Sequence, residues 1–153
     1  ELSLLTNPST NSYKRLHPAR PQSGASWTPA TASFGGNDRT VMVRVPDVDR
    51  LETRLPDGSA NPYLLQASII AAGLGDTLFD INKADNRNEK TPREPGVLPR
   101  HLGEAIGRFE QSQLVDRAFH KEARDAILSL KKAEWGEYLD QITSWESKTY
   151  LDC

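Results

Sequence analysis

Hydrophobic and polar positions divide the chain into two parts of different character. Short runs of alternating polarity predict strands at about residues 25–56, and longer apolar periods predict helices at about 61–150. Residues 1–38 are rich in Pro, Ser, Gly and Asn, which predicts loops with one strand near 25–34. A sheet followed by helices is typical of the α+β class.

Two strand-like runs, residues 39–45 and 50–55, predict a hairpin. In the second run an extended backbone turns alternate side chains to opposite faces. One face then carries Arg50, Glu52 and Arg54, and the other turns Leu51, Thr53 and Leu55 towards a core.

The segment between these runs, from Pro46 to Asp49, predicts a turn. If residues 47–49 form a three-residue loop, Pro46 faces Arg50 and Arg44 lies opposite Glu52. The hairpin then presents one carboxylate among guanidinium groups.

In the helical part, Asn61 followed by Pro62 predicts a helix start. Residues 63–74 are apolar nearly all round, which predicts a buried helix. Residues 82–100 predict a mobile polar loop. We expect a short helix at 101–111 and a long one at 120–148, with one stripe that holds Ile127, Leu130, Glu134, Tyr138, Ile142 and Trp145.

Composition narrows the classes of partner and compartment. The net charge of −2 gives no reason to expect a nucleic acid or an anionic membrane surface. The apolar stretch at 64–74 is too short to span a bilayer. A single cysteine, Cys153, fits a reducing compartment, so we expect a cytoplasmic protein.

The hairpin charges allow two interpretations. Several arginines suit a polyanion such as a nucleotide phosphate, and a carboxylate among them suits a divalent cation that bridges to it. The same pattern also fits a solvated strand face held by ion pairs, and on this pattern alone the second interpretation is favoured. The Trp27, Trp135 and Trp145 side chains are assigned to packing rather than to cofactor stacking.

An ordered series of motifs along the chain reverses this preference and favours a binding site over a structural ion-pair network. Its motifs lie at 7–16, 37–40, 44–46, 50–57 and 60–63. This series resembles the C-terminal half of the glutamine synthetase catalytic domain. The match continues through 71–74 and, more loosely, through 132–135 and 145–146 to the end of the chain. Residues 22–27 and 151–153 are more similar to the branch that makes gamma-glutamyl amides, including gamma-glutamylmethylamide synthetases.

The resemblance implies a reaction and its partners. Such enzymes use ATP to phosphorylate L-glutamate, and ammonia or a small primary amine then displaces phosphate from the gamma-glutamyl phosphate. The resemblance implies an antiparallel sheet followed by helices, Mg²⁺ or Mn²⁺ as cofactor and a ring-shaped homo-oligomer. The chain opens at Glu1 without an initiator Met, so we expect residues 1–153 to be the C-terminal part of a longer enzyme, inactive without its N-terminal part. The alternative is a non-catalytic fragment with an assembly or regulatory role.

The motifs also imply roles for individual residues. Arg15, Arg39 and Arg54 would bind substrate glutamate, and Arg39 would also stabilise charge on the transferring phosphoryl group. Arg39, Arg44 and Arg50 would bind ATP phosphates, and Glu52 would be a metal ligand. An ion pair between Glu52 and Arg44 is the structural alternative for that carboxylate.

One position departs from the family pattern. Many glutamine synthetases carry a flap glutamate shortly after the motif at 7–16, and Pro21 occupies that place here. In the family this glutamate helps to deprotonate ammonium. Its replacement therefore favours a substituted amine, while the residues leave the identity of the amine open.

Overall fold

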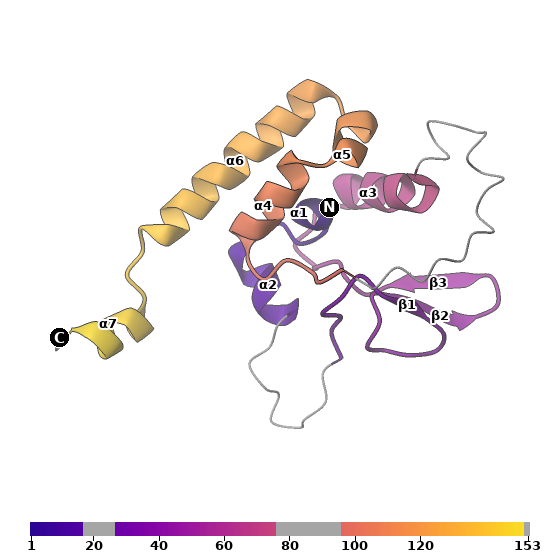
Figure 1. Cartoon of the computed structure of the whole chain (residues 1–153), viewed down its shortest axis with the longest axis horizontal. Coiled ribbons are helices and arrows are strands. Elements are labelled where there is room, and N and C mark those ends of the chain that lie inside the picture. Colours follow the sequence, from indigo (N-terminus) through magenta and orange to yellow (C-terminus); the bar gives the residue numbers. More distant parts are fainter. Residues whose placement is uncertain (17–26, 76–95, 152–153) are drawn as a thin grey trace.

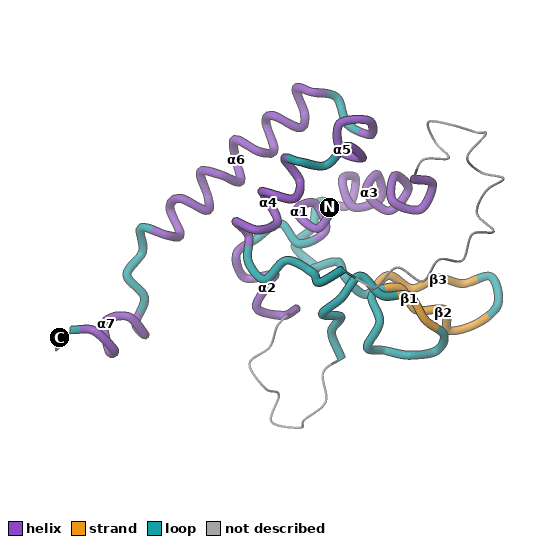
Figure 2. Tube along the Cα trace, viewed as in Figure 1, coloured by secondary structure: helices purple, strands orange, loops and turns teal. Residues whose placement is uncertain are grey.

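The computed structural model describes residues 1–16, 27–75 and 96–151, with helices gathered on one side of a small sheet (Figure 1 and Figure 2). The α+β class is confirmed. The helices are α1 (Ser3–Thr6), α2 (Thr10–Leu16), α3 (Pro62–Leu74), α4 (Leu102–Glu110), α5 (Gln113–Ala118), α6 (Lys121–Leu139) and α7 (Ser144–Tyr150), and the strands are β1 (Phe34–Gly35), β2 (Val43–Asp47) and β3 (Arg50–Thr53).

The hydrophobic core lies among the helices. Its largest side chains come from α1, α2, α4 and α5, and α6 packs against α4. Burying one such side chain stabilises a fold by about 1.5–3 kcal/mol. We call this set the helical core; it includes Leu4, Tyr13, Leu16, Leu102, Phe109 and Val115, each at most 1% exposed.

Two helices lie where loops were expected. The short α1 buries Leu4 and Leu5, and α2 buries Tyr13 and Leu16. Ser9 and Ser12 each donate a backbone N–H to the other's Oγ at 3.2 Å, which closes the start of α2. The prediction of loops was wrong here because burial in the core outweighs the low helix propensity of Ser, Thr and Asn.

Helix α3 begins as predicted but is not buried. The Asn61 side chain accepts hydrogen bonds from the N–H groups of Tyr63 and Leu64, and Pro62 occupies the first turn. Only one face, with Ser68 and Ala71, is fully buried. Tyr63 is 82% exposed. The prediction of a helix that is buried on all sides is therefore wrong, because the described residues of the chain cover only one face of α3.

The last helices differ from the predicted pair in number. Helix α4 lies at the expected place, with His101 as its N-cap, but α5 was not predicted. The single helix expected at 120–148 is two helices, because Thr143 and Glu146 form a capping box that starts α7. The stripe is also displaced: Leu128 is buried and Leu130 is 65% exposed.

The sheet has the order β1-β2-β3, with β1 parallel to β2 and β2 antiparallel to β3. The expected antiparallel pairing is therefore correct for the hairpin and wrong for β1. The strand expected near 25–34 reaches only Phe34 within the described residues, while Thr31 forms an isolated bridge with Val97. Backbone hydrogen bonds therefore join residues 96–98 to the chain ahead of β1. Of the loop expected at 82–100, residues 82–95 lie outside the described residues.

The hairpin register combines one correct and one wrong prediction. Arg44 lies opposite Glu52 as predicted, but Asp47, not Pro46, faces Arg50. The loop therefore has two residues, and Asp49 adopts a positive φ of 61° there. A bulge between Arg44 and Asp47 supplies the extra residue that restores the predicted pair.

The outer face of the hairpin is open. Leu51 is 69% exposed and Thr53 is exposed, so the prediction that both face a core is wrong, whereas Leu55 packs against the helical core. The described residues place no further layer over this face. No helix among them is long and apolar enough to cross a membrane.

Candidate active site

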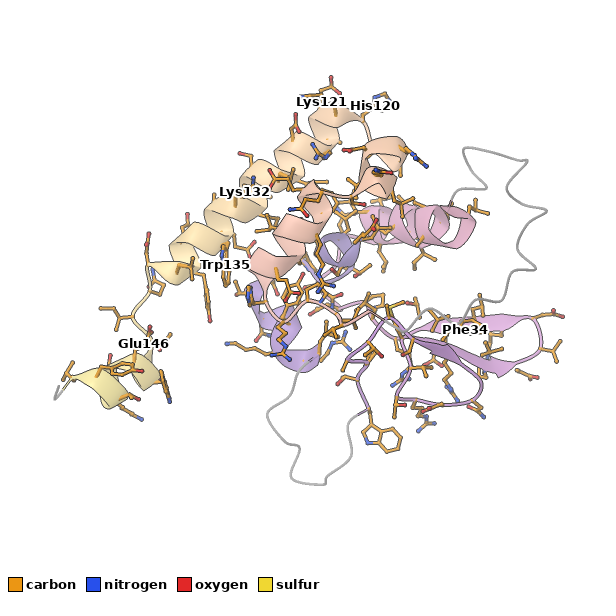
Figure 3. All side chains as sticks on the ribbon, viewed as in Figure 1. Phe34, His120, Lys121, Lys132, Trp135 and Glu146 are labelled. Atoms are coloured by element: carbon orange, nitrogen blue, oxygen red, sulfur yellow. The ribbon has the colours of Figure 1, made fainter. Side chains whose placement is uncertain are left out.

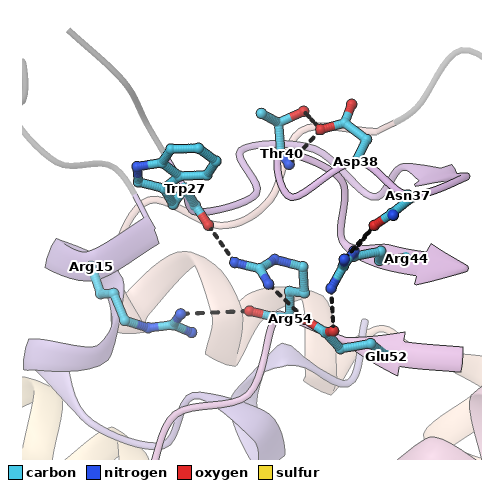
Figure 4. Close-up of polar contacts among 8 residues, drawn as sticks. All are labelled: Arg15, Trp27, Asn37, Asp38, Thr40, Arg44, Glu52 and Arg54. Carbon is cyan, nitrogen blue, oxygen red and sulfur yellow. Dashed lines mark hydrogen bonds and ion pairs between the residues drawn. The ribbon is translucent and has the colours of Figure 1, made fainter. Parts of the chain in front are cut away.

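An open hollow of about 450 Å³ lies beside the hairpin (Figure 4). Its residues come from three places: the chain ahead of β1, the loop between β1 and β2, and the hairpin with its exit. We call it the polar hollow; its lining is Trp27, Arg39, Arg44, Glu52 and Arg54.

Glu52 lies between two guanidinium groups. Arg54 Nη1 donates to Glu52 Oε1 at 2.6 Å, and Arg44 Nη1 donates to Glu52 Oε2 at 2.7 Å. The hydrogen bond from Arg54, followed by that from Arg44, holds the pKa of Glu52 below its ordinary value. The carboxylate is therefore ionised at neutral pH, and its side chain is 37% exposed.

Each of these arginines is fixed by a second partner. Arg44 Nε donates to the Asn37 side-chain oxygen at 3.0 Å, and Arg44 Nη2 donates to the same atom. Arg54 Nη2 donates to the Trp27 carbonyl oxygen at 2.9 Å. The guanidinium groups are thus pre-arranged around Glu52 by residues outside the hairpin.

Arg39 enters the polar hollow from the loop before β2. Asp38 Oδ1 accepts hydrogen bonds from the Thr40 N–H and hydroxyl, both at 2.8 Å, so the backbone turns at this point. The Arg39 Cζ lies 5.9 Å from the centroid of the Trp27 ring. This distance is within the range of a cation–π contact.

The charge of the polar hollow is positive. Three guanidinium groups and one carboxylate give a formal charge of +2, because Arg39, Arg44 and Arg54 outnumber Glu52. Arginine forks bind phosphate and carboxylate oxygens with paired hydrogen bonds. The geometry therefore suits an anion with several oxygens.

Arg15 lies apart from this group. Its Nη1 donates to the carbonyl of Arg54 at 3.5 Å, and its Nη2 donates to the carbonyls of Leu55 and, at 3.1 Å, Pro56. Figure 4 shows Arg15 reaching the backbone behind Arg54 rather than the Glu52 carboxylate. In this arrangement Arg15 holds the exit of β3, and the helix α2 that carries it is anchored in the core.

Arg50 is also outside the polar hollow. It lies exposed at the start of β3, opposite Asp47. The structure therefore brings together Arg39, Arg44, Glu52 and Arg54 out of the six predicted site residues.

Glu52 suits a hard divalent cation as one ligand of several. A carboxylate has about four lone-pair positions, so the two arginine bonds leave acceptor capacity on each oxygen. Within residues 1–16, 27–75 and 96–151, no group of three or more His, Cys, Asp and Glu side chains is placed to hold a metal ion. Glu52 therefore fits a metal only together with ligands from elsewhere.

Trp27 was assigned to packing by the sequence, and the structure places it in the polar hollow with 57% of its surface exposed. Nothing in its local sequence indicates Arg39 as a neighbour. Trp135 is different, because it is half-buried and stacks between His101 and Tyr138.

A larger hollow of about 590 Å³ lies between α4 and α6. Trp135 and Lys132 line it from α6 (Figure 3). Lys132 Nζ already donates to Glu110 Oε1 at 2.6 Å, and Glu104 already pairs with Arg108. The polar hollow beside the hairpin is therefore the stronger candidate for chemistry.

Comparison with known proteins identifies the class. Residues 1–150 match the family model of the glutamine synthetase catalytic domain, and the chain belongs to this family.

Two curated relatives and one solved structure illustrate the similarity. The chain is 42% identical to a glutamine synthetase of Rhizobium meliloti (strain 1021) and 38% identical to a glutamate–methylamine ligase of Methyloversatilis universalis, over 99% of this chain and 36% of each relative. It is also similar to a GmaS chain solved in complex with ADP, with a TM-score of 0.78 and 40% identity, over 99% of this chain and 36% of that one. The chain thus spans about a third of the length of these relatives.

Proposed function

We propose that the enzyme to which this chain contributes joins L-glutamate to ammonia or a small primary amine, using ATP and a gamma-glutamyl phosphate intermediate. The observation that carries the proposal is the polar hollow. It holds two guanidinium groups that are hydrogen-bonded to an ionised carboxylate, and a third, that of Arg39, in the same lining. Membership of the glutamine synthetase family supports the reaction class.

The chemistry needs positive charge at two stages. In the first, a side-chain carboxylate oxygen of glutamate attacks the γ-phosphorus of ATP, and ADP leaves. In the second, the amine nitrogen attacks the acyl carbon, phosphate leaves, and the nitrogen loses a proton. Negative charge on the transferring phosphoryl group is best stabilised by donors that are already oriented.

The proposed residue roles are those that the family motifs imply, and three of the arginines line the polar hollow. Arg39 is proposed to contact the transferring phosphoryl group, and Arg44 the phosphates of ATP. Arg54 and Arg39 are proposed to bind the substrate glutamate. The described geometry favours these three over Arg15 and Arg50.

Arg15 and Arg50 keep their proposed roles in the complete site, with a condition for each. Arg15 would bind the glutamate carboxylate only after releasing part of its hold on the backbone carbonyls. Arg50 would reach ATP phosphates from the start of β3, where its side chain is exposed.

Glu52 is the proposed ligand for Mg²⁺ or Mn²⁺. When bound, such a cation would neutralise phosphate charge. Because Glu52 is held between Arg44 and Arg54, its oxygens are oriented before any metal arrives. Further carboxylates would have to come from the part of the enzyme that lies outside this chain.

The enzyme is proposed to use a substituted amine, such as methylamine, at least as readily as ammonia. Pro21 stands where many family members carry a glutamate, and proline can neither accept a proton nor attract ammonium. This position lies outside the described residues. The similarity to a glutamate–methylamine ligase points in the same direction.

The complete enzyme is further proposed to be a cytoplasmic homo-oligomer, with this chain as the C-terminal part of each catalytic domain. The exposed apolar side chains of α3 support association, since Tyr63 is 82% and Ile70 is 56% exposed. No role for nucleic acid or membrane is included in the proposal.

The test is amide formation from glutamate, ATP and either ammonia or methylamine, followed by ADP release and product analysis. We expect the complete enzyme to form the amide and the 153-residue chain alone to form none. A divalent cation needs several oxygen ligands, and no group of three ligating side chains lies within the part of the chain that the structure describes. Detectable ATP-dependent amide formation by the isolated chain would contradict the proposed division. Absence of activity in the complete enzyme would favour the alternative, a non-catalytic protein with an assembly or regulatory role.

The same assay compares the two amines. We expect kcat/KM for methylamine, corrected for the free-base fraction, to be at least comparable to that for ammonia. A preference for ammonia above about a hundredfold, roughly 2.7 kcal/mol, would show that the Pro21 position does not set the amine.

A further inference from the structure

Trp27 makes two different contacts in the polar hollow. Its carbonyl oxygen accepts a hydrogen bond from Arg54 Nη2 at 2.9 Å, so its backbone is tied to the exit of β3. Its ring lies 5.9 Å from the Arg39 guanidinium carbon. Trp27 therefore contacts both arginines that are proposed to bind substrate glutamate: Arg54 through its carbonyl (Figure 4) and Arg39 through its ring.

The exposure of Trp27 is unusual for a packing residue. Its side chain is 57% exposed, and it is not among the hydrophobic residues that pack against the helical core. A packing role would place the indole against apolar neighbours. Here the neighbours that line the same hollow are three arginines and a glutamate.

Arg39 differs from the other two arginines in how it is held. Arg44 and Arg54 each donate to Glu52 and to a second oxygen acceptor. For Arg39 the indole of Trp27 is the contact that the structure gives. A planar guanidinium that faces an aromatic ring keeps its N–H groups free to point outward at an anion, because the ring occupies the face and not the edge.

We propose that Trp27 is a positioning residue that orients Arg39 for the phosphoryl group of ATP. The inference rests on the proposed function for the identity of the anion. Trp27 acts through Arg39: the bond from Arg54 to its carbonyl holds the backbone that carries the indole, and the indole orients the guanidinium of Arg39. Replacing the ring frees Arg39 to rotate, while the carbonyl bond to Arg54 remains.

The test uses the complete enzyme with Trp27→Leu, which keeps apolar bulk but removes the aromatic face, and Trp27→Phe, which keeps a face. The matched control is Trp145→Leu on α7, since Trp145 is similarly exposed at 63% and pairs with Tyr150 away from the polar hollow. The probe is tripolyphosphate, whose binding is measured by calorimetry, alongside kcat and KM for ATP.

We expect Trp27→Leu to weaken tripolyphosphate binding and lower kcat/KM for ATP by about fivefold, the fold-change of ~1 kcal/mol for an exposed cation–π contact. Trp27→Phe should stay within about twofold, and Trp145→Leu should change neither quantity. In an Arg39→Ala background, Trp27→Leu should cause no further loss, because the two residues act as one unit.

Two results would overturn the proposal. Unchanged binding in Trp27→Leu would show that Arg39 needs no such support. An equal loss in the Arg39→Ala background would make Trp27 a structural residue that acts independently of Arg39. If the wild-type enzyme forms no amide, the proposed function fails, and the tripolyphosphate arm still decides the role of Trp27.

Discussion

The helical core and the polar hollow are built on opposite principles. In the helical core, side chains such as Leu102 and Phe109 have no exposed surface and make apolar contacts. In β1, β2 and β3, all of which the structure describes, no residue is fully buried, and the side chains of Arg44 and Glu52 make charged contacts.

This difference separates stability from chemistry. Apolar burial supplies most of the free energy that favours folding, whereas partly exposed ion pairs contribute little. Substitutions in the helical core should therefore change the free energy of unfolding. Substitutions in the polar hollow should change binding and turnover while the fold persists.

The largest effect on stability is expected from Phe109→Ala. Removing this fully buried ring leaves a cavity in the helical core beside α4, so the free energy of unfolding should fall by about 3–5 kcal/mol. Urea unfolding measures it. The matched control is Phe34→Ala on β1, where the ring is 70% exposed and the change should stay within about 0.5 kcal/mol. Similar losses for the two variants would erase the contrast between the regions.

A smaller effect is expected from Gly103→Ala in α4. A Cβ at this position would lie 2.6 Å from Trp135 Nε1, and the Trp135 ring is held by stacking on His101 and Tyr138. The collision should cost about 1–3 kcal/mol in thermal or urea unfolding.

The control for this substitution is Gly107→Ala, one turn further along the same helix. A Cβ there meets no atom within 4 Å, so the helix should gain about 0.5–1 kcal/mol from the lost freedom of glycine. A stabilised Gly103→Ala variant would show that Trp135 moves aside without cost.

The smallest expected effect is a pH dependence in the polar hollow. The bonds from Arg54 and Arg44 lower the folded-state pKa of Glu52 below its ordinary value of 4.5. The stability from this pairing is therefore present above pH 4.5 and lost as pH falls through the lowered folded pKa. At pH 7 the unfolding midpoint of Glu52→Gln should lie only slightly below that of wild type, because a partly exposed ion pair contributes little, and the two curves should converge in acid. A difference that grows in acid would give the wrong sign.

Local signals in the sequence were enough to predict several features. Asn61 with Pro62 marked the start of α3, and the pairing of Arg44 with Glu52 was correct. The pairing was reached through a wrong loop length, because a two-residue turn and a bulge together restore the register. The capping box of Thr143 and Glu146 was visible in the sequence, although the apolar stripe that runs past it favoured one long helix.

Other features depend on contacts between distant segments. The four residues of α1 have no periodicity, and their helix is stabilised by burial in the core. Which face of α3 is covered follows from tertiary packing, as does the place of Trp27 beside Arg39. Arg15 and Arg50 shared the motif pattern with Arg39, yet backbone geometry directs them away from the polar hollow.

The central claim is that Glu52 and its arginines perform chemistry rather than hold the hairpin together. The most direct test is kcat of the complete enzyme with Glu52→Gln, measured over a range of Mg²⁺ concentrations. The control is Asp49→Asn, which removes the same charge from the turn of the same hairpin, where asparagine tolerates the positive φ.

We predict that Glu52→Gln lowers kcat by about a hundredfold or more and requires more Mg²⁺, since a key electrostatic group is lost while the size of the side chain is kept. The Asp49→Asn variant should retain wild-type turnover, and both variants should unfold close to the wild-type denaturant midpoint at neutral pH. Near-normal turnover and metal dependence in Glu52→Gln would contradict the account and leave Glu52 as an ion-pair partner of Arg44 and Arg54.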